Sequence, residues 1–215
     1  MKRNPYLNYT RLPMENAYNV RELGGYATKK GSITIHHQFL RSENLTDITE
    51  EDKMFLIEYG LSGIIDLRSR EEALIYPNPF RGNNAVKYIN CPLITDGILD
   101  LRAVKEVGFD PGEFYVKLVE YKEMLYKIFH FILDNIDGCL LFHCQAGKDR
   151  TGVLAMILMG LAGVSKEDIV ANYEVTHTYK ENVKLRLEDG LEELEFSKPQ
   201  WIEKAYDHII EHYGS

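Results

Sequence analysis

The sequence predicts an α/β fold with a mostly parallel central sheet flanked by helices and a mainly helical C-terminal part. Short apolar runs of strand length alternate with longer segments of helical periodicity, which is typical of a parallel sheet. The clearest unit joins the apolar run 140–142 through a tight loop to the apolar segment 153–162, as strand, loop and buried helix. With 215 residues the chain is most simply one domain, 1–215.

The N-terminal half begins with an arm and continues with alternating elements. Residues 1–18 show no hydrophobic periodicity and predict an extended arm, and the pair Gly24-Gly25 predicts a turn. The stretch from Thr49 to Asp52 resembles the capping box of a helix that ends at Gly60. Loose alternation and short apolar runs predict strands at 32–39, 61–67 and 86–91.

The C-terminal half is predicted to be mainly helical. Residues 92–112 are rich in Gly, Pro and Asp and predict a loop or a mobile lid that carries Asp96, Asp100 and Asp110. Apolar residues recur every three or four positions over 114–136, which predicts one long amphipathic helix. Further helices are predicted after a cap at Ser165, over the acidic stretch 181–196, and from Pro199 onward.

Composition and charge exclude several classes of function. The net charge of −8 argues against general binding to nucleic acid or to anionic membranes, yet permits a local cationic pocket. Three cysteines make no disulfide framework and fit a reducing compartment. The longest apolar stretch, 152–164, is too short to span a bilayer, and no stable membrane insertion is expected. We expect a cytoplasmic protein, although export by another route stays open.

The stretch 139–152 places a cysteine and an arginine around one anion-binding point. Cys144 ends the strand, and the loop amides and the first turn of the next helix converge where the helix dipole favours negative charge. Thiols in such surroundings ionise with pKa values of roughly 3.5–7.5 instead of about 8.5, so we expect Cys144 to be a thiolate nucleophile. Arg150 supplies a planar fork that can hold two phosphate oxygens.

The pattern His143-Cys144-x5-Arg150-Thr151-Gly152 resembles the phosphate-binding loop of cysteine-dependent protein tyrosine phosphatases. The version Gly147-Lys148-Asp149-Arg150-Thr151 is similar to the bacterial family with dual or triple specificity, whose loop also resembles that of phosphoinositide phosphatases. The bare Cys-x5-Arg spacing is weak evidence, whereas the flanking residues and the strand–loop–helix context make it strong. The resemblance implies a protein tyrosine phosphatase-like fold.

Weaker family-like motifs extend the resemblance over residues 19–173. They are Asn19-x-Arg21-Glu22-Leu23-Gly24-Gly25, in which Glu22 replaces the usual Asp, then Arg41-Ser42, Asp66-Leu67-Arg68-Ser69 and Asn172-Tyr173. Arg21 either contacts substrate or pairs with a carboxylate within a structural turn, and both readings stay open. Asp66 is expected to act as an acid, to orient Arg150, or to form an ion pair with Arg68 or Arg21.

The resemblance also assigns roles to the loop. Cys144 attacks phosphorus, and Arg150 and the loop amides hold the equatorial oxygens. Asp149 is the first candidate for the general acid and Asp66 the second. His143 is expected to hydrogen-bond to backbone, and the Thr151 hydroxyl to donate to the thiolate or the product. The expected phosphate-binding residues are Gln145, Ala146, Gly147, Lys148, Asp149, Arg150 and Thr151.

Phosphotyrosine in proteins is the favoured substrate, and several alternatives remain. Lys148 adds a second cation that suits phosphoinositides, and it serves equally well as general electrostatic support. A non-catalytic phosphate-binding module is a further alternative. A zinc site built from Cys139, His143 and Cys144 lacks paired-cysteine spacing and a fourth ligand, so no metal or organic cofactor is implied. Cys91 and Cys139 are expected in the core, with a reversible disulfide to Cys144 as a minor alternative.

Overall fold

The computed structural model of the chain describes residues 3–94, 109–180 and 196–214. Most of the predicted lid, including Asp96 and Asp100, lies outside the described residues. The same holds for all but the last residue of the acidic stretch 181–196. The expectations for these two segments therefore stay predictions.

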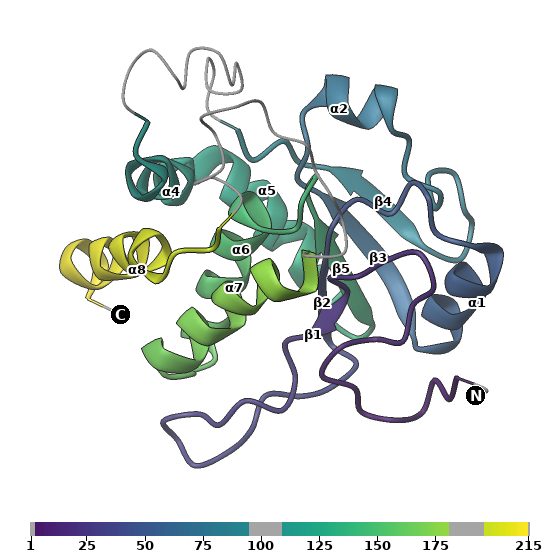
Figure 1. The fold of residues 1–215 in the computed structure, drawn as a ribbon, viewed down its shortest axis with the longest axis horizontal. Coiled ribbons are helices and arrows are strands. Elements are labelled where there is room, and N and C mark those ends of the chain that lie inside the picture. Colours follow the sequence, from purple (N-terminus) through teal and green to yellow (C-terminus); the bar gives the residue numbers. More distant parts are fainter. Residues whose placement is uncertain (1–2, 95–108, 181–195, 215) are drawn as a thin grey trace.

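A five-stranded sheet forms the centre of the described structure, in the order β1-β2-β5-β3-β4 (Figure 1). All neighbouring strands run parallel except β1 and β2, which are antiparallel, so the expected mostly parallel sheet is confirmed. The central position of β5 places the loop that follows it in the middle of the sheet edge, where ligands bind in parallel sheets. The strands are β1 Arg21–Glu22, β2 Phe39–Ser42, β3 Leu61–Asp66, β4 Lys87–Asn90 and β5 Cys139–His143.

Helices cover both faces of this sheet. Figure 1 shows α4, α6, α7 and α8 gathered on one side and α1 on the other. Seven helices lie in the described part of the chain: α1 Glu50–Glu58, α2 Arg70–Ile75, α4 Pro111–Glu120, α5 Lys122–Leu133, α6 Asp149–Leu161, α7 Lys166–Lys180 and α8 Pro199–Tyr213.

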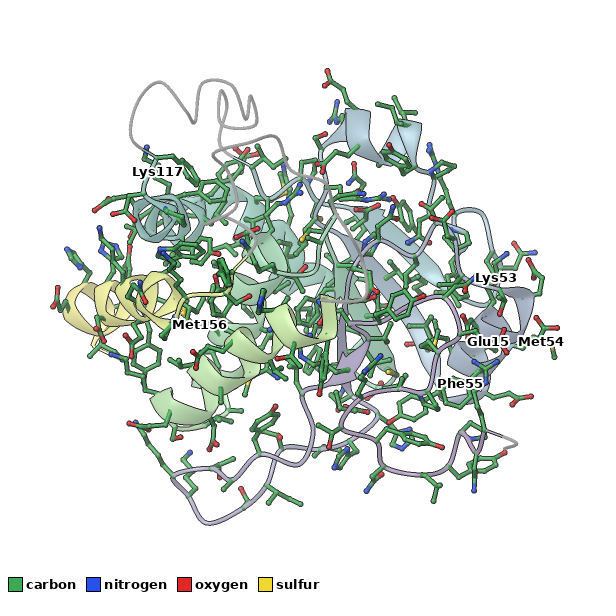
Figure 2. All side chains as sticks on the ribbon, in the orientation of Figure 1. Glu15, Lys53, Met54, Phe55, Lys117 and Met156 are labelled. Carbon is green, nitrogen blue, oxygen red and sulfur yellow. The ribbon has the colours of Figure 1, made fainter. Side chains whose placement is uncertain are left out.

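Strand β5 is buried on both faces, which is why its sequence is continuously apolar. Leu140 and Phe142 belong to the hydrophobic cluster beneath α4 to α8, whereas Leu141 belongs to the cluster beneath α1. Met156 of α6 and Phe55 of α1, both labelled in Figure 2, are buried members of these two clusters. The strand and the residues at its end are therefore held rigidly from both sides.

The predicted strand at 32–39 is wrong. The structure places β2 at Phe39–Ser42, while residues before it form an arm with an isolated bridge between Ala27 and Ile33. Ile33 and Ile35, which suggested the alternation, are 65% and 72% exposed. The segment that pairs with β5 is instead Phe39–Ser42. Its Arg41 is buried, because this side chain has hydrogen-bond partners at the site described below.

The long helix predicted over 114–136 is two helices. The chain breaks at Tyr121, whose backbone (φ −77°, ψ 65°) is not helical, and α5 ends at Leu133. Helix α4 begins at Pro111, so the last two residues of the predicted lid are helical. Asp110 caps this helix by accepting from the amide of Gly112 at 2.8 Å. The apolar period continues across the break because both helices pack on the same cluster.

Two other local features depend on helix caps. The predicted cap at Thr49 is confirmed, since its side chain accepts from the amide of Asp52 at 3.0 Å. Helix α2 was not predicted, although Ser69 and Glu72 form a complete capping box at its start. This six-residue helix matters because it brings Glu72 to the loop that follows β5.

Candidate active site

Residues 144–148 form the loop that leaves β5 and enters α6 at Asp149. The strand, loop and buried helix expected from the sequence are therefore present, with α6 beginning four residues earlier than the apolar segment suggested. Cys144 is buried at the end of the strand. The guanidinium of Arg150, in the first turn of the helix, is close enough for the two groups to interact electrostatically.

The carbonyl groups of the loop are all held by donors, most of which come from other elements. Because successive carbonyls are bonded in this way, the loop amides are left to face the opposite side, as in an anion-binding nest. No acceptor among the described residues bonds to the amides of Gln145, Ala146, Gly147 or Arg150. The donors are His143 Nδ1 to Cys144 O (3.2 Å), Asn44 N to Gln145 O (3.1 Å), Asn19 Nδ2 to Ala146 O (3.3 Å), Arg41 Nη2 to Gly147 O (2.8 Å) and Gly152 N to Lys148 O (2.7 Å).

Gly147 is required by both conformation and space. Its φ is +66°, a region that side chains rarely adopt. A Cβ added there would lie 2.6 Å from the carbonyl oxygen of Ser42 and 2.7 Å from the amide of Glu43. The loop is thus pressed against the end of β2, and only glycine allows this approach.

The Asn19-x-Arg21 and Arg41-Ser42 motifs support the loop from its carbonyl side. Arg21 is fully buried and donates to Asn172 O at 2.7 Å and to Thr176 Oγ1 at 2.8 Å. It thus pairs with a helix of the C-terminal part rather than with a carboxylate. Arg41 donates to Asn172 Oδ1 at 2.6 Å as well as to the loop. Burial lowers the pKa of Arg41 to about 10, although Cys144 nearby raises it.

Glu72 orients Arg150, a partnership that the sequence analysis missed. Its two carboxylate oxygens accept from Arg150 at 2.7 and 3.0 Å, and one of them also accepts from the amide of Ser69 at 2.8 Å. Burial alone would lower the pKa of Arg150, but the hydrogen bonds to Glu72 and the negative charge of that carboxylate raise it above its ordinary value. The capping box Ser69-x-x-Glu72 was the only local signal, and it predicts a helix start rather than this contact.

Asp66 forms the buried ion pair with Arg68 that was one of its three expected roles. Its carboxylate accepts from Arg68 at 2.9 and 2.7 Å and from the Tyr88 hydroxyl at 2.8 Å. Burial raises the pKa of Asp66, but the Arg68 hydrogen bonds and nearby charges more than offset this and hold it below the ordinary value. The structure shows Glu72, and not Asp66, on the guanidinium of Arg150.

His143 holds the loop as expected. Burial lowers the pKa of His143 to about 4, so its ring is neutral at physiological pH. The side-chain nitrogen Nδ2 of Asn78 donates to Nε2 of His143 at 2.9 Å. The ring hydrogen therefore resides on Nδ1 and is donated to the carbonyl of Cys144.

Asp149 stands at the mouth of the site, with 34% of its side chain exposed. The hydroxyl of Tyr115 donates to its Oδ1, and Lys148 Nζ lies 3.4 Å from the same oxygen. Lys148 is itself buried, donates to Phe196 O at 3.3 Å and lies 5.3 Å from the ring centre of Trp201. The Asp149 carboxyl group is thus more accessible than the side chains of Cys144, Lys148 and Arg150, which are buried.

Three other residues singled out in the sequence are buried: Thr151, Cys91 and Cys139. The Thr151 hydroxyl is buried and has no hydrogen-bond partner within the described residues, so the structure does not show the expected bond to Cys144. Cys91 and Cys139 are buried and free, and burial raises the pKa of Cys91 to about 11 and that of Cys139 further. Both therefore stay protonated at neutral pH, as core residues do.

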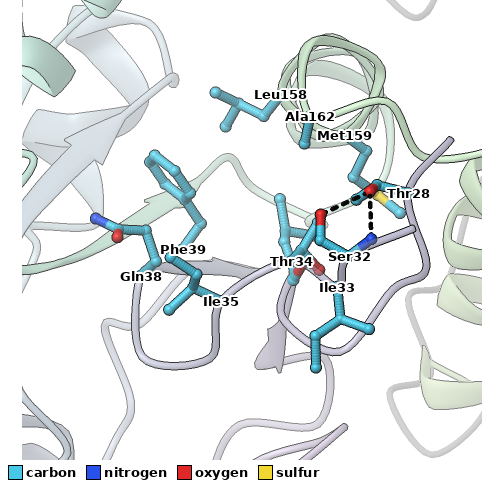
Figure 3. Close-up of a pocket in the computed structure, with 11 residues that line it drawn as sticks. Thr28, Ser32, Ile33, Thr34, Ile35, Gln38, Phe39, Leu158, Met159 and Ala162 are labelled. Atoms are coloured by element: carbon cyan, nitrogen blue, oxygen red, sulfur yellow. Dashed lines mark hydrogen bonds between the residues drawn. The ribbon is translucent and has the colours of Figure 1, made fainter. Parts of the chain in front are cut away.

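A separate cavity of about 280 Å³ lies between the arm that precedes β2 and the end of α6 (Figure 3). Hydrogen bonds of 2.9 and 3.3 Å join Thr28 and Ser32, two of its lining residues, as Figure 3 shows. Its lining includes Ile33, Phe39 and Met159 but no residue of the loop 144–148 and neither Asp149 nor Arg150. This cavity is therefore distinct from the candidate active site.

Within the ranges 3–94, 109–180 and 196–214, no cluster of three or more His, Cys, Asp or Glu side chains is arranged to hold a metal ion. Over the same ranges, no helix is long and apolar enough to cross a membrane.

Comparison with known proteins places the chain in a family. The model of the tyrosine phosphatase family matches residues 12–215. A tyrosine-protein phosphatase of Nostoc commune is 35% identical over 145 residues, which are 66% of this chain and 49% of that protein. A putative tyrosine-protein phosphatase of Cupriavidus necator is 28% identical over 169 residues, 75% of this chain and 61% of that protein. This chain therefore spans about half to three fifths of the length of these relatives.

Solved structures resemble the chain more distantly. The human tyrosine phosphatase-like serine/threonine/tyrosine-interacting protein matches with a TM-score of 0.44 at 14% identity, covering 82% of this chain and 93% of that one. The core catalytic domain of the PP-IP phosphatase SIW14 from S. cerevisiae matches with 0.42 at 18% identity, covering 95% and 96%. Likeness at this level supports no functional inference. The match of the family model over nearly the whole chain does, and it shows that the chain belongs to the tyrosine phosphatase family.

Proposed function

We propose that this protein is a cysteine-dependent phosphatase that hydrolyses phosphate monoesters, with phosphotyrosine in proteins as its main substrate. One observation carries the proposal. The carbonyls of residues 144–148 are all bonded to donors, which leaves the loop amides for an anion in front of Cys144 and Arg150. A phosphate monoester is mostly a dianion at neutral pH and fits a site of fixed N–H donors with one oriented guanidinium.

The reaction proceeds in two steps that share the same groups. The Cys144 thiolate attacks phosphorus, so that an S–P bond forms while the ester P–O bond breaks and the leaving oxygen takes a proton from Asp149. Asp149 then takes a proton from water, whose oxygen attacks phosphorus and breaks the S–P bond. Phosphate and the thiolate are released. Arg150, held by Glu72, and the amides stabilise the equatorial oxygens in both steps.

Asp149 is favoured over Asp66 as the acid. Asp149 is partly exposed beside the loop, whereas Asp66 is fully buried and has both carboxylate oxygens bonded to Arg68. Protonating Asp66 would remove the charge that compensates the buried Arg68, which is costly. We assign Asp66 to the support of the strand end, together with His143, whose Nε2 is 3.7 Å away.

Phosphoinositides are the second candidate substrate. Lys148 Nζ lies 3.4 Å from Asp149 Oδ1, and a second cation beside the loop suits a substrate with a further phosphate group. The printed names of the curated relatives refer to tyrosine phosphatases, which supports phosphotyrosine as the first candidate. The three free cysteines support a location in the reducing cytoplasm.

The test compares turnover of three substrate classes by wild type, Cys144→Ser and a control variant. Phosphotyrosine peptide, phosphoserine peptide and phosphoinositides are assayed with a chelator present. Cys139→Ser is the matched control because Cys139 is a buried cysteine at the other end of the same strand. We expect fastest turnover of the phosphotyrosine peptide, retained in Cys139→Ser and abolished in Cys144→Ser.

Other outcomes of this assay separate the alternatives. Turnover that survives in Cys144→Ser would refute the thiolate mechanism. Faster turnover of phosphoinositides would favour the lipid substrate. Phosphate binding to the wild type without turnover of any substrate would favour a non-catalytic phosphate-binding module.

A further inference from the structure

Two buried tyrosines lie behind Asp149. Tyr115 of α4 and Tyr173 of α7 are almost completely buried, and their hydroxyl oxygens are 2.7 Å apart. Their rings meet edge to face, with centres 5.9 Å apart and planes at 80°. The hydroxyl of Tyr115 also bonds to Oδ1 of Asp149. Two helices far apart in the sequence thus converge on the carboxyl group at the start of α6.

The hydrogens of this chain have a fixed direction. A carboxylate only accepts, so Tyr115 must give its single hydroxyl hydrogen to Asp149. Tyr115 can then only accept from Tyr173, which makes Tyr173 the donor in that contact. Burial and the Asp149 charge raise the pKa of Tyr115 well above its ordinary value, and the same two causes raise that of Tyr173. Both hydroxyls therefore stay protonated at every physiological pH.

Gly152, of the Arg150-Thr151-Gly152 end of the loop motif, makes room for this arrangement. A Cβ added to it would lie 3.0 and 3.3 Å from two ring carbons of Tyr173, closer than nine in ten real contacts of a Cβ atom, so the ring would have to shift. The first turn of α6 is thus packed directly against the Tyr173 ring. The glycine serves the position of Tyr173, and through Tyr173 that of Tyr115.

Resting on the function proposed above, we propose that Tyr115, backed by Tyr173, is the positioning residue of the general acid Asp149. Tyr115 and Lys148 both address Oδ1, which leaves Oδ2 as the oxygen that carries the transferable proton. A donor bonded to Oδ1 fixes the orientation of the Asp149 carboxyl plane. Oδ2 is then already directed at the leaving oxygen, and the side chain need not change rotamer before it transfers the proton. Lys148 cannot do this alone, because an ammonium is a rotatable point charge rather than a directed donor.

The test uses leaving groups that differ in their need for an acid. Phenyl phosphate needs protonation of its leaving oxygen, whereas 2,4-dinitrophenyl phosphate does not, and kcat/KM reports the steps up to the S–P bond. We expect Tyr115→Phe to lower kcat/KM for phenyl phosphate by about tenfold, a part of the roughly 10²–10⁴ that a general acid contributes. The loss for the dinitrophenyl ester is expected to be much smaller. Tyr173→Phe should show the same selectivity with a smaller loss.

A matched control and a double variant make the result specific. Tyr121→Phe, at the C-cap of the same helix α4, should leave kcat/KM for both esters unchanged. In an Asp149→Asn background, adding Tyr115→Phe should cause no further loss on phenyl phosphate, because a residue that acts through Asp149 is silent without it. Equal losses on the two esters, or losses that add in the double variant, would overturn the proposal.

Failure of this inference is distinguishable from failure of the proposed function. If Cys144→Ser abolishes turnover and Asp149→Asn shows the leaving-group selectivity while Tyr115→Phe does not, only the role of Tyr115 is refuted. If Asp149→Asn itself affects both esters equally, the assignment of Asp149 as the acid fails, and the role of Tyr115 fails with it.

Discussion

Replacing Glu72 by glutamine tests whether this residue of α2 orients Arg150. The substitution keeps the size of the side chain and removes its charge from a pair whose side chains are only 8% and 24% exposed. Glu72 accepts two hydrogen bonds from Arg150, at 2.7 and 3.0 Å, and glutamine has one oxygen to accept with. The buried guanidinium then keeps one acceptor at this position and loses the opposing charge.

The size of the effect follows from these contacts. A hydrogen bond to a charged group contributes about 1.5–3 kcal/mol, so we expect Glu72→Gln to lose about 2–3 kcal/mol of stability. For a domain of this size 1 kcal/mol corresponds to about 2–4 °C, so Tm should fall by about 4–12 °C. Because a misaligned Arg150 holds the transition state less well, kcat/KM for a phosphotyrosine peptide should fall at least about tenfold.

The measurement is thermal unfolding together with kcat/KM. Glu71→Gln is the matched control, because Glu71 is its neighbour in α2 and is exposed, and it should change neither quantity. An unchanged Tm and unchanged kcat/KM in Glu72→Gln would refute the role given to this pair. A fall in Tm without any loss of kcat/KM would show that Glu72 stabilises the fold but does not orient Arg150.

Two further predictions concern the loop and the strand end. Gly147→Ala should abolish most of the activity and lower the free energy of unfolding by more than the roughly 1–3 kcal/mol of backbone strain alone, because its Cβ would overlap Ser42 O. Gly82→Ala is the control, because Gly82 also has a positive φ but nothing within 4 Å of an added Cβ, so it measures the strain by itself. Equal losses of stability in the two variants would contradict the close contact at Gly147. Asp66→Asn should destabilise the protein at pH 7 and progressively less as the pH falls. The folded-state pKa of Asp66 is below the ordinary value of about 3.9, so its contribution is present above that value and is lost as pH falls through the folded pKa. A stability difference from wild type that stays constant between pH 7 and pH 2 would contradict this.

Strand β5 and the loop that follows it were predictable because their signals are local. The strand at 139–143 is a continuous apolar run, since both of its faces are buried, and the loop follows it directly in the sequence. The positions of Cys144 at the start of the loop and of Arg150 in the first turn of α6 follow from this local geometry alone.

The elements that were missed depend on contacts distant in the sequence. Strand β2 carries the buried Arg41, whose polarity hides the strand until its partners at Gly147 and Asn172 are known. The break at Tyr121 leaves the apolar period intact, because α4 and α5 share one cluster. Hydrophobic periodicity reports which face is buried, and it does not report where the axis of a helix changes.

The supporting residues of the site were missed for the same reason. Glu72 is 78 positions from Arg150, and Tyr115 is 34 positions from Asp149. Neither contact leaves a pattern in the sequence, since each needs the sheet to bring two elements to one edge. The motif containing Asn19 was recognisable, but its bond to the loop carbonyls spans 127 positions and appears only in the fold.

The covalent intermediate on Cys144 is the central claim, and trapping it is the most direct test. In Asp149→Asn with 2,4-dinitrophenyl phosphate, the first step needs no acid while the second lacks its base, so the intermediate should accumulate. Rapid quenching and mass spectrometry of the peptides should then find one phosphoryl group on the peptide that contains Cys144, and none in Cys144→Ser. Burst release of dinitrophenol with no phosphoryl group on Cys144, or with the group on another residue, would contradict the account.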